Sequence, residues 1–202
     1  MPVFSLNVKN VVPLGTPGDI IKTRELEYTK FLKLEIKDVD FRYKPILLGG
    51  LHNLVGISPP AFNKYKSKNL RNDCELVASK NNINFQWNKK FPINSLNMMR
   101  GYLCVEQSKK KEYLETFFEA YWVNDIDLTK NENINLLLDN LNIDKDKFFN
   151  DLKNQSIKDE LKKVTNDAFE RDVFGAPTFI VNKKLFWGQD RLEYAIEELK
   201  KN

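Results

Sequence analysis

The segment VFGAPTFIVNKKLFWGQDRLEYAIEEL, residues 173–199, constrains the fold more than any other part of the chain. It reads as a turn, a strand, a two-residue Asn182-Lys183 turn, a second strand and a helix. An X-Pro bond directly before a strand is the usual position of a cis proline. We therefore expect Ala176-Pro177 either to offer the backbone of Ala176 to an extended peptide or to form a simple turn into a core strand.

The residues Gly188-Gln189-Asp190 precede the last helical pattern of this segment. A helix start leaves main-chain N–H groups free and carries partial positive charge, so it can bind a carboxylate. Asp190 can accept hydrogen bonds from an ammonium group, act as a simple N-cap, or do both. The segment therefore predicts a site for a group that carries a carboxylate and an ammonium, such as a γ-glutamyl group.

The rest of the chain divides into a mixed part and a helical part. A helical rhythm begins at about Asp19, residues 39–48 read as a strand that Gly49-Gly50 ends, and residues 51–60 read as a loop. Helical patterns then follow one another, with either Asn94 or Ser95, and Asp144, among their start signals. This order predicts an α/β sheet domain interrupted by an all-helical insertion.

We place the boundaries of these two parts from the same pattern. The sheet domain is expected to comprise residues 1–60 and 165–202, so that both ends of the chain share one sheet. The helical insertion is expected to comprise residues 61–164. No internal repeat or low-complexity linker separates the two parts.

The charge pattern argues against a nucleic-acid partner. The chain has 32 Lys and Arg residues against 28 Asp and Glu residues, so its formal net charge is only +4. The lysine run at 109–111 precedes Glu112 and Glu115 in a helical pattern, which favours a solvated helix face. A nucleic-acid-binding protein more often concentrates its positive charge in one stripe.

The two cysteines, Cys74 and Cys104, form no CxxC motif and no disulfide framework. Both lie in helical patterns, which favours buried, inert thiols over nucleophiles. No apolar run has the length of a membrane span, and the first residues lack the apolar core of a signal peptide. We expect a cytoplasmic protein with no membrane partner and no metal site.

Several segments together resemble the 2-hydroxychromene-2-carboxylate isomerase family, which is grouped with kappa-class glutathione transferases and DsbA-like thioredoxin-fold proteins. They occur in the family's order, and the resemblance covers roughly residues 42–199: RYKPILLGGL (42–51), the Pro59-Pro60 pair followed by Lys66, FPINSLNMMR (91–100), EAYWVNDIDL (119–128), FGAPTFIV and LFWGQDRLEY. The resemblance implies the fold class α/β, with a thioredoxin-like sheet domain and an all-helical insertion.

The resemblance also implies an activity and its cofactor. Family members are isomerases that bind glutathione, form homodimers and isomerise a small aromatic chromene or benzylidene-pyruvate intermediate. Kappa-class relatives instead conjugate glutathione to electrophiles. A kappa-like transferase, and a non-catalytic relative that binds glutathione or another thiol, therefore stay as alternatives.

The resemblance assigns glutathione contacts to particular residues. Ala176, fixed by Pro177, would offer its backbone to the cysteinyl part, and Gln189 and Asp190 would hold the γ-glutamyl end. Lys66 matches the lysine that reaches the glycyl carboxylate; without the resemblance it would read as an ordinary surface lysine.

The catalytic position differs from the family pattern. Family members have a Ser-Pro-Tyr motif at the start of the first helix, where the serine hydroxyl stabilises the glutathione thiolate. Here Gly15-Thr16-Pro17 is the nearest match, so Thr16 is the candidate catalytic residue. Alternatively, Thr16 is only a turn residue. Ile57 also stands where the family often has a glutathione-binding asparagine.

The chain has a single histidine, His52, directly after the Gly-Gly pair. Its ordinary pKa suits acid–base catalysis, and its position should border the site. A histidine without a functional role is the alternative.

Overall fold

The computed structural model describes residues 4–5 and 42–201. Thr16 and the helical pattern from about Asp19 lie outside the described residues, so both stay predictions.

The described sheet joins the first and last parts of the chain. It has the order β1 (Phe4–Ser5), β2 (Thr178–Val181) and β3 (Lys184–Trp187). Strand β1 is parallel to β2, and β2 is antiparallel to β3. Asn182 and Lys183 connect β2 to β3 with φ values of 50° and 66°, which confirms the predicted two-residue hairpin turn. Every residue of β2 is buried, so this strand belongs to the core.

Eight α-helices and three short 3₁₀ helices accompany the sheet within the described residues. Their bounds are α2 (Leu48–Val55), η1 (Pro60–Phe62), α3 (Lys64–Lys80), α4 (Leu96–Cys104), η2 (Gln107–Lys109), α5 (Lys110–Trp122), α6 (Asn131–Asn140), α7 (Lys145–Asp151), α8 (Gln155–Phe169), η3 (Gln189–Arg191) and α9 (Leu192–Leu199).

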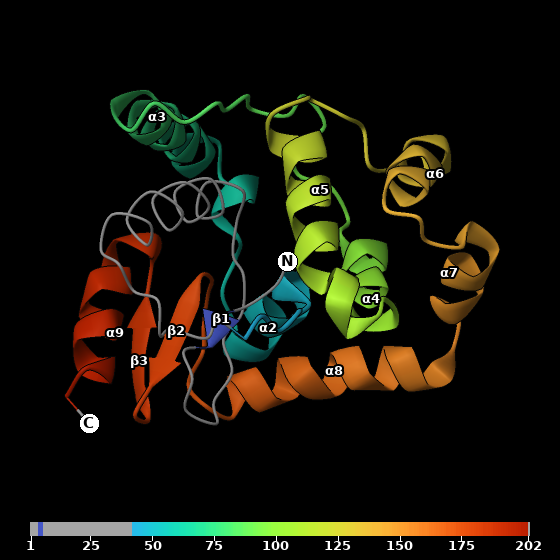
Figure 1. Cartoon of the computed structure of the whole chain (residues 1–202). Helices are drawn as coiled ribbons and strands as arrows, with labels where there is room; N and C mark the ends of the chain where they lie inside the picture. Colours follow the sequence, from blue (N-terminus) through green and yellow to red (C-terminus); the bar gives the residue numbers. More distant parts are fainter. Residues whose placement is uncertain (1–3, 6–41, 202) are drawn as a thin grey trace.

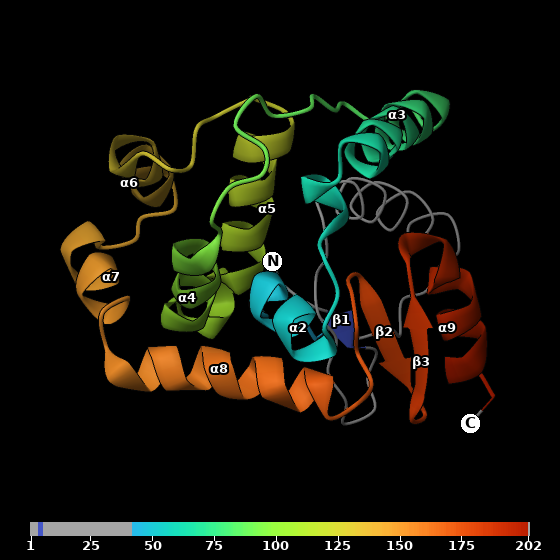
Figure 2. The same cartoon turned by 180° about the vertical axis from the view of Figure 1, so that it is seen from behind.

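The two structural parts lie at opposite ends of the molecule. Helix α9 packs on β2 and β3 at one end, whereas α4, α5, α6 and α7 gather at the other (Figure 1). Helix α8 runs along one side and contacts both α2 and α4, and the reverse view shows the same arrangement (Figure 2). The proposed boundary between residues 164 and 165 falls inside α8, which continues across it.

Two helices of the insertion begin where the sequence predicts. The Asp144 side chain caps α7 by accepting a hydrogen bond from the Lys147 N–H at 2.9 Å. Ser95 directly precedes α4. The aromatic residues Tyr113 and Phe117 of α5 are buried and stacked, with 4.2 Å between ring centroids.

The strand predicted over residues 39–48 is wrong in the described part. Among residues 42–48 only Tyr43 forms an isolated bridge, and α2 begins at Leu48. Gly49 and Gly50 therefore lie inside a helix rather than ending a strand, and the loop begins only at Gly56. The apolar residues from Leu48 to Val55 follow a helical spacing that buries Leu51 completely. Gly56 ends α2 in the left-handed conformation, with φ 77°.

Candidate functional site

The Ala176-Pro177 bond is cis, as the sequence predicts. The Pro177 carbonyl accepts a hydrogen bond from the Gly188 N–H at 2.9 Å, which joins this turn to the segment after β3. The Thr178 hydroxyl donates to the Gly175 carbonyl at 2.8 Å. Between these anchored neighbours, the main chain of Ala176 forms no hydrogen bond with the described residues.

Asp190 lies close to this turn, on the far side of Gly188. Gly188 has φ 104°, and a Cβ atom there would lie 2.6 Å from the Asp190 Oδ1 atom. The carboxylate is exposed, and its Oδ2 atom is 3.3 Å from Nη1 of Arg191. Arg191, not Asp190, is the N-cap of α9, and no side chain caps this helix. The simple N-cap interpretation of Asp190 is therefore wrong.

The other predicted glutathione contacts lie at different places. Gln189 begins η3, between Gly188 and Asp190. Lys66 is in the first turn of α3 and borders a surface hollow whose other described lining residues come from η1 and α3. Figure 1 shows α3 and the β2–β3 hairpin as separate elements. The structure thus brings Ala176, Pro177, Gln189 and Asp190 together at the two ends of the hairpin, and Lys66 belongs to α3.

A cavity that the sequence did not predict lies between α2, α4 and α5. Its volume is about 270 Å³, and aromatic and aliphatic side chains form most of its wall. The described lining residues are Leu47, Leu48, Gly49, His52, Pro59, Ala61, Phe62, Phe91, Pro92, Ile93, Asn94, Ser95, Met98, Met99, Tyr102, Tyr113, Leu114, Phe117, Phe118, Tyr121, Trp122 and Leu128. Apolar walls with a few polar groups are typical of small-molecule sites.

The polar groups of the cavity are neutral. His52 is 5% exposed, and burial lowers the pKa of its imidazole below the ordinary value of 6.5. The hydroxyls of Tyr102 and Tyr113 donate to the carbonyls of Tyr43 and Met98. No Lys, Arg, Asp or Glu lines the cavity among the described residues.

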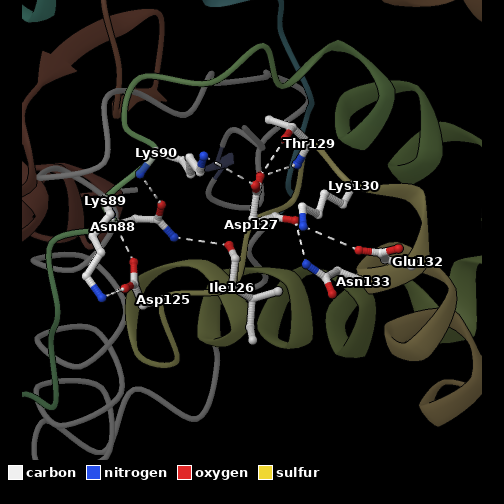
Figure 3. Close-up of polar contacts among 10 residues, drawn as sticks. All are labelled: Asn88, Lys89, Lys90, Asp125, Ile126, Asp127, Thr129, Lys130, Glu132 and Asn133. Atoms are coloured by element: carbon white, nitrogen blue, oxygen red, sulfur yellow. Dashed lines mark hydrogen bonds and ion pairs between the residues drawn. The ribbon is translucent and has the colours of Figure 1, made fainter.

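A hydrogen-bond network connects residues 88–90 to the segment that follows α5 (Figure 3). The buried Asn88 side chain donates to the carbonyls of Tyr121 at 2.9 Å and Ile126 at 3.1 Å. Its Oδ1 atom accepts from the Lys90 N–H at 2.8 Å. The Asp125 carboxylate accepts a hydrogen bond from the Lys89 N–H at 2.9 Å and forms an ion pair with the Lys89 ammonium. These contacts connect residues 88–90 to the segment after α5.

The buried state of His52 predicts a pH dependence of stability. Because the folded pKa is lowered, the unfolded chain binds a proton at His52 first as the pH falls below about 6.5. The free energy of unfolding should therefore fall more steeply between about pH 7.5 and about pH 5.5 in the wild type than in His52→Gln. Urea unfolding at several pH values measures this difference. Parallel curves for the two proteins would contradict the predicted shift.

The cysteines fit the expectation of inert thiols. Burial, together with Asp151, raises the pKa of Cys104 to about 11, so this thiol stays protonated at neutral pH. Cys74 is fully buried. In the part of the chain that the structure describes, there is no group of three potential metal-ligating His, Cys, Asp or Glu residues, and no helix is long and apolar enough to cross a membrane.

Comparison with known proteins supports the resemblance seen in the sequence. A 2-hydroxychromene-2-carboxylate isomerase of Sphingobium xenophagum is 24% identical over 129 residues, which cover 64% of this chain and 66% of that relative. A protein of the same name from Pseudomonas putida is 29% identical over 100 residues, 49% of each chain. The chain thus spans between about half and two thirds of the curated relatives' length.

A solved structure of a 2-hydroxychromene-2-carboxylate isomerase has the same fold. It matches with a TM-score of 0.81 and 22% identity, covering 99% of this chain and 94% of that one. This likeness confirms an α/β, thioredoxin-like sheet domain with an all-helical insertion. A match to the DSBA-like thioredoxin domain extends over residues 23–200, and the protein belongs to that family.

Proposed function

We propose that the protein is a glutathione-dependent cis–trans isomerase that acts on aromatic intermediates of the 2-hydroxychromene-2-carboxylate type. The observation that carries this proposal is the convergence of separate sequence segments on one aromatic cavity. Residues from the ranges 47–52, 59–62, 91–99 and 121–128 contribute to its wall. These ranges overlap four of the six segments on which the resemblance to the isomerases rests; the other two form the β2–β3 hairpin and its flanks, where the glutathione contacts are expected.

The reaction needs no redox group and no metal. The cyclic hemiketal of a chromene opens first: its ring C–O bond breaks, the hydroxyl proton passes to the phenolic oxygen, and the hemiketal carbon becomes a conjugated ketone. The glutathione thiolate then adds to the C=C bond, forming a C–S bond while the π electrons move to the ketone oxygen as an enolate. The former double bond can then rotate. Collapse of the enolate re-forms the C=C bond and expels the thiolate unchanged. The protein supplies binding, orientation and stabilisation of the thiolate and the enolate.

In this proposal glutathione binds along the turn that joins Ala176 to Asp190. Neither the N–H nor the carbonyl of Ala176 forms a hydrogen bond with the described residues. Both could therefore pair with the backbone of the cysteinyl residue of glutathione. Asp190 and the start of η3 would receive the γ-glutamyl ammonium and carboxylate. Thr16 is proposed as the thiolate partner and Lys66 as the partner of the glycyl carboxylate.

Dithiol–disulfide exchange, the chemistry of many thioredoxin folds, has no motif here. The chain's two cysteines are 30 positions apart in sequence, and the pKa of Cys104 is raised rather than lowered. The proposal places the protein in a reducing cytoplasm, where glutathione is present. It also includes a homodimeric assembly.

Asp190→Asn tests the glutathione site. The variant keeps the size of the side chain but removes the negative charge that would attract the γ-glutamyl ammonium. We expect glutathione to bind about tenfold more weakly, since hydrogen bonds to charged groups contribute about 1.5–3 kcal/mol. Titration calorimetry measures the dissociation constants.

Asp167→Asn is the matched control, because Asp167 is an exposed carboxylate on α8, outside the segment from Ala176 to Asp190. It should bind glutathione as the wild type does. Wild-type protein that fails to bind glutathione at millimolar concentration would refute the proposal. Turnover of a chlorinated nitroarene in place of the chromene would instead indicate a kappa-like transferase.

A further inference from the structure

A basic surface hollow shares part of its wall with the aromatic cavity. Its lining includes three cationic side chains and two residues of η1, together with one tryptophan: Lys64, Lys68, Arg71, Ala61, Phe62 and Trp87. Ala61 and Phe62 also line the cavity. Phe62 is 73% exposed, so the wall of the cavity reaches the protein surface at this residue. The cavity and the basic hollow therefore lie side by side at η1.

Aromatic contacts form a second link between the two spaces. The ring of Trp87, in the basic hollow, has its centroid 4.8 Å from that of Phe91 and 6.0 Å from that of Trp122. Phe91 and Trp122 both line the cavity. The boundary between the cavity and the basic hollow is thus aromatic on both sides, which suits a ligand whose ring lies in the cavity and whose substituent reaches the hollow.

The two lysines of the basic hollow have no counterion among the described residues. Neither Lys64 nor Lys68 forms a side-chain hydrogen bond or an ion pair there, whereas Arg71 pairs with Glu75 at 2.8 Å. Both lysines are exposed and lie four positions apart, so they share one face of α3. Lys64 is the first residue of this helix, where positive charge opposes the helix dipole, and no acidic residue lies in the first turn. This placement of charge does not stabilise the helix, but it leaves two neighbouring cations free for an anion.

The basic hollow and the cavity suit different parts of an aromatic carboxylate. The described wall of the cavity has no cationic side chain, so a carboxylate inside it would lose its hydration without gaining a countercharge. In the basic hollow a carboxylate keeps contact with water and meets positive charge. No Asp or Glu is among the described residues that line the hollow. The aromatic ring belongs in the cavity, and its carboxylate belongs outside, at the lysines.

We propose that Lys64 and Lys68 bind the carboxylate of the aromatic substrate while its ring occupies the cavity behind Phe62. The two lysines then select anionic aromatic compounds over neutral ones. This inference rests on the proposed function, because it assigns the orientation of the substrate in that site. Lys66, the proposed partner of the glycyl carboxylate of glutathione, lines a different hollow of α3, so the two carboxylates have separate sites.

The test compares 2-naphthoate with its uncharged analogue 2-naphthamide by titration calorimetry at low ionic strength. We expect the wild type to bind 2-naphthoate about fivefold more tightly, because each exposed ion pair contributes little and two act together. The double variant Lys64→Gln/Lys68→Gln should lose this preference and bind 2-naphthamide as the wild type does. Salt at about 1 M should also remove the preference in the wild type. Equal affinity of the wild type for the two probes, or an unchanged preference in the double variant, would overturn the assignment.

Lys162→Gln/Lys163→Gln is the matched control. It removes the same charge from exposed positions on α8 that line neither the cavity nor the basic hollow. This variant should keep the preference for 2-naphthoate; its loss here would assign the preference to overall charge and contradict the proposal.

Glutathione binding separates this inference from the proposed function. The Lys64→Gln/Lys68→Gln variant should bind glutathione as the wild type does. An equal loss of affinity for glutathione and for 2-naphthoate would assign the two lysines to glutathione and overturn the inference. Wild-type protein that prefers 2-naphthoate but binds no glutathione would support the carboxylate site and refute the glutathione-dependent activity.

Discussion

Replacing Asn88 with alanine is expected to lower the free energy of unfolding by about 3 kcal/mol. Asn88 is 1% exposed, and its amide connects three main-chain groups: the carbonyls of Tyr121 and Ile126 and the N–H of Lys90. Alanine would leave these groups without a partner, and each unpaired buried group costs about 1–3 kcal/mol. Water entering the gap would recover part of this cost. Urea unfolding followed by tryptophan fluorescence measures the change.

Asn81→Ala is the matched control. Asn81 also donates its side-chain amide to a carbonyl, that of Val77 at 2.8 Å, but it is exposed at the end of α3. Water can replace this bond, so we expect a loss below about 1 kcal/mol. The account of the network would be wrong if the two variants lost the same stability.

Replacing Gly101 with alanine is expected to destabilise the protein by about 2 kcal/mol. Gly101 lies inside α4, where the usual effect of this substitution is a gain of up to about 1 kcal/mol. Here the added Cβ would collide with the Tyr113 hydroxyl and lie 2.5 Å from the Phe148 ring. Both neighbours are buried aromatic side chains, so neither can move without disturbing the core. The close approach of α4 to α5 and α7 therefore requires glycine.

Replacing Gly49 with alanine, in helix α2, is expected to have the opposite effect on stability. A Cβ atom at Gly49, in α2, would have no neighbour within 4 Å, so helix propensity alone should act and stability should rise slightly. Thermal or urea unfolding of the two variants measures the sign of each change. A stabilised Gly101→Ala protein would contradict the packing described for α4.

Local signals predicted the C-terminal part of the fold. The Asn182-Lys183 pair adopts the left-handed conformation that the hairpin turn requires, and Asp144 caps its helix directly. Such features depend on a few neighbouring residues, so the local sequence predicts them. The same holds for the proximity of Ala176 and Asp190, since one short hairpin connects them.

Residues 42–56 were predicted poorly, because composition and periodicity disagree there. Aromatic and β-branched residues suggested a strand, whereas the spacing of Leu48, Leu51 and Val55 suits a helix, and burial of Leu51 decides for the helix. The cavity was missed for a different reason. Its wall joins segments that are distant in sequence, and no local pattern shows that Tyr121 lacks a hydrogen-bond partner while Tyr113 has one.

The most direct test of the proposed function is the conversion of 2-hydroxychromene-2-carboxylate to its open-chain benzylidene-pyruvate isomer by the purified protein, followed by chromatography with and without glutathione. The account predicts rapid interconversion in both directions when millimolar glutathione is present, with no net consumption of glutathione, and only the spontaneous rate when it is absent. Conversion at the spontaneous rate in the presence of glutathione, or equally fast enzymatic conversion without it, would contradict the account.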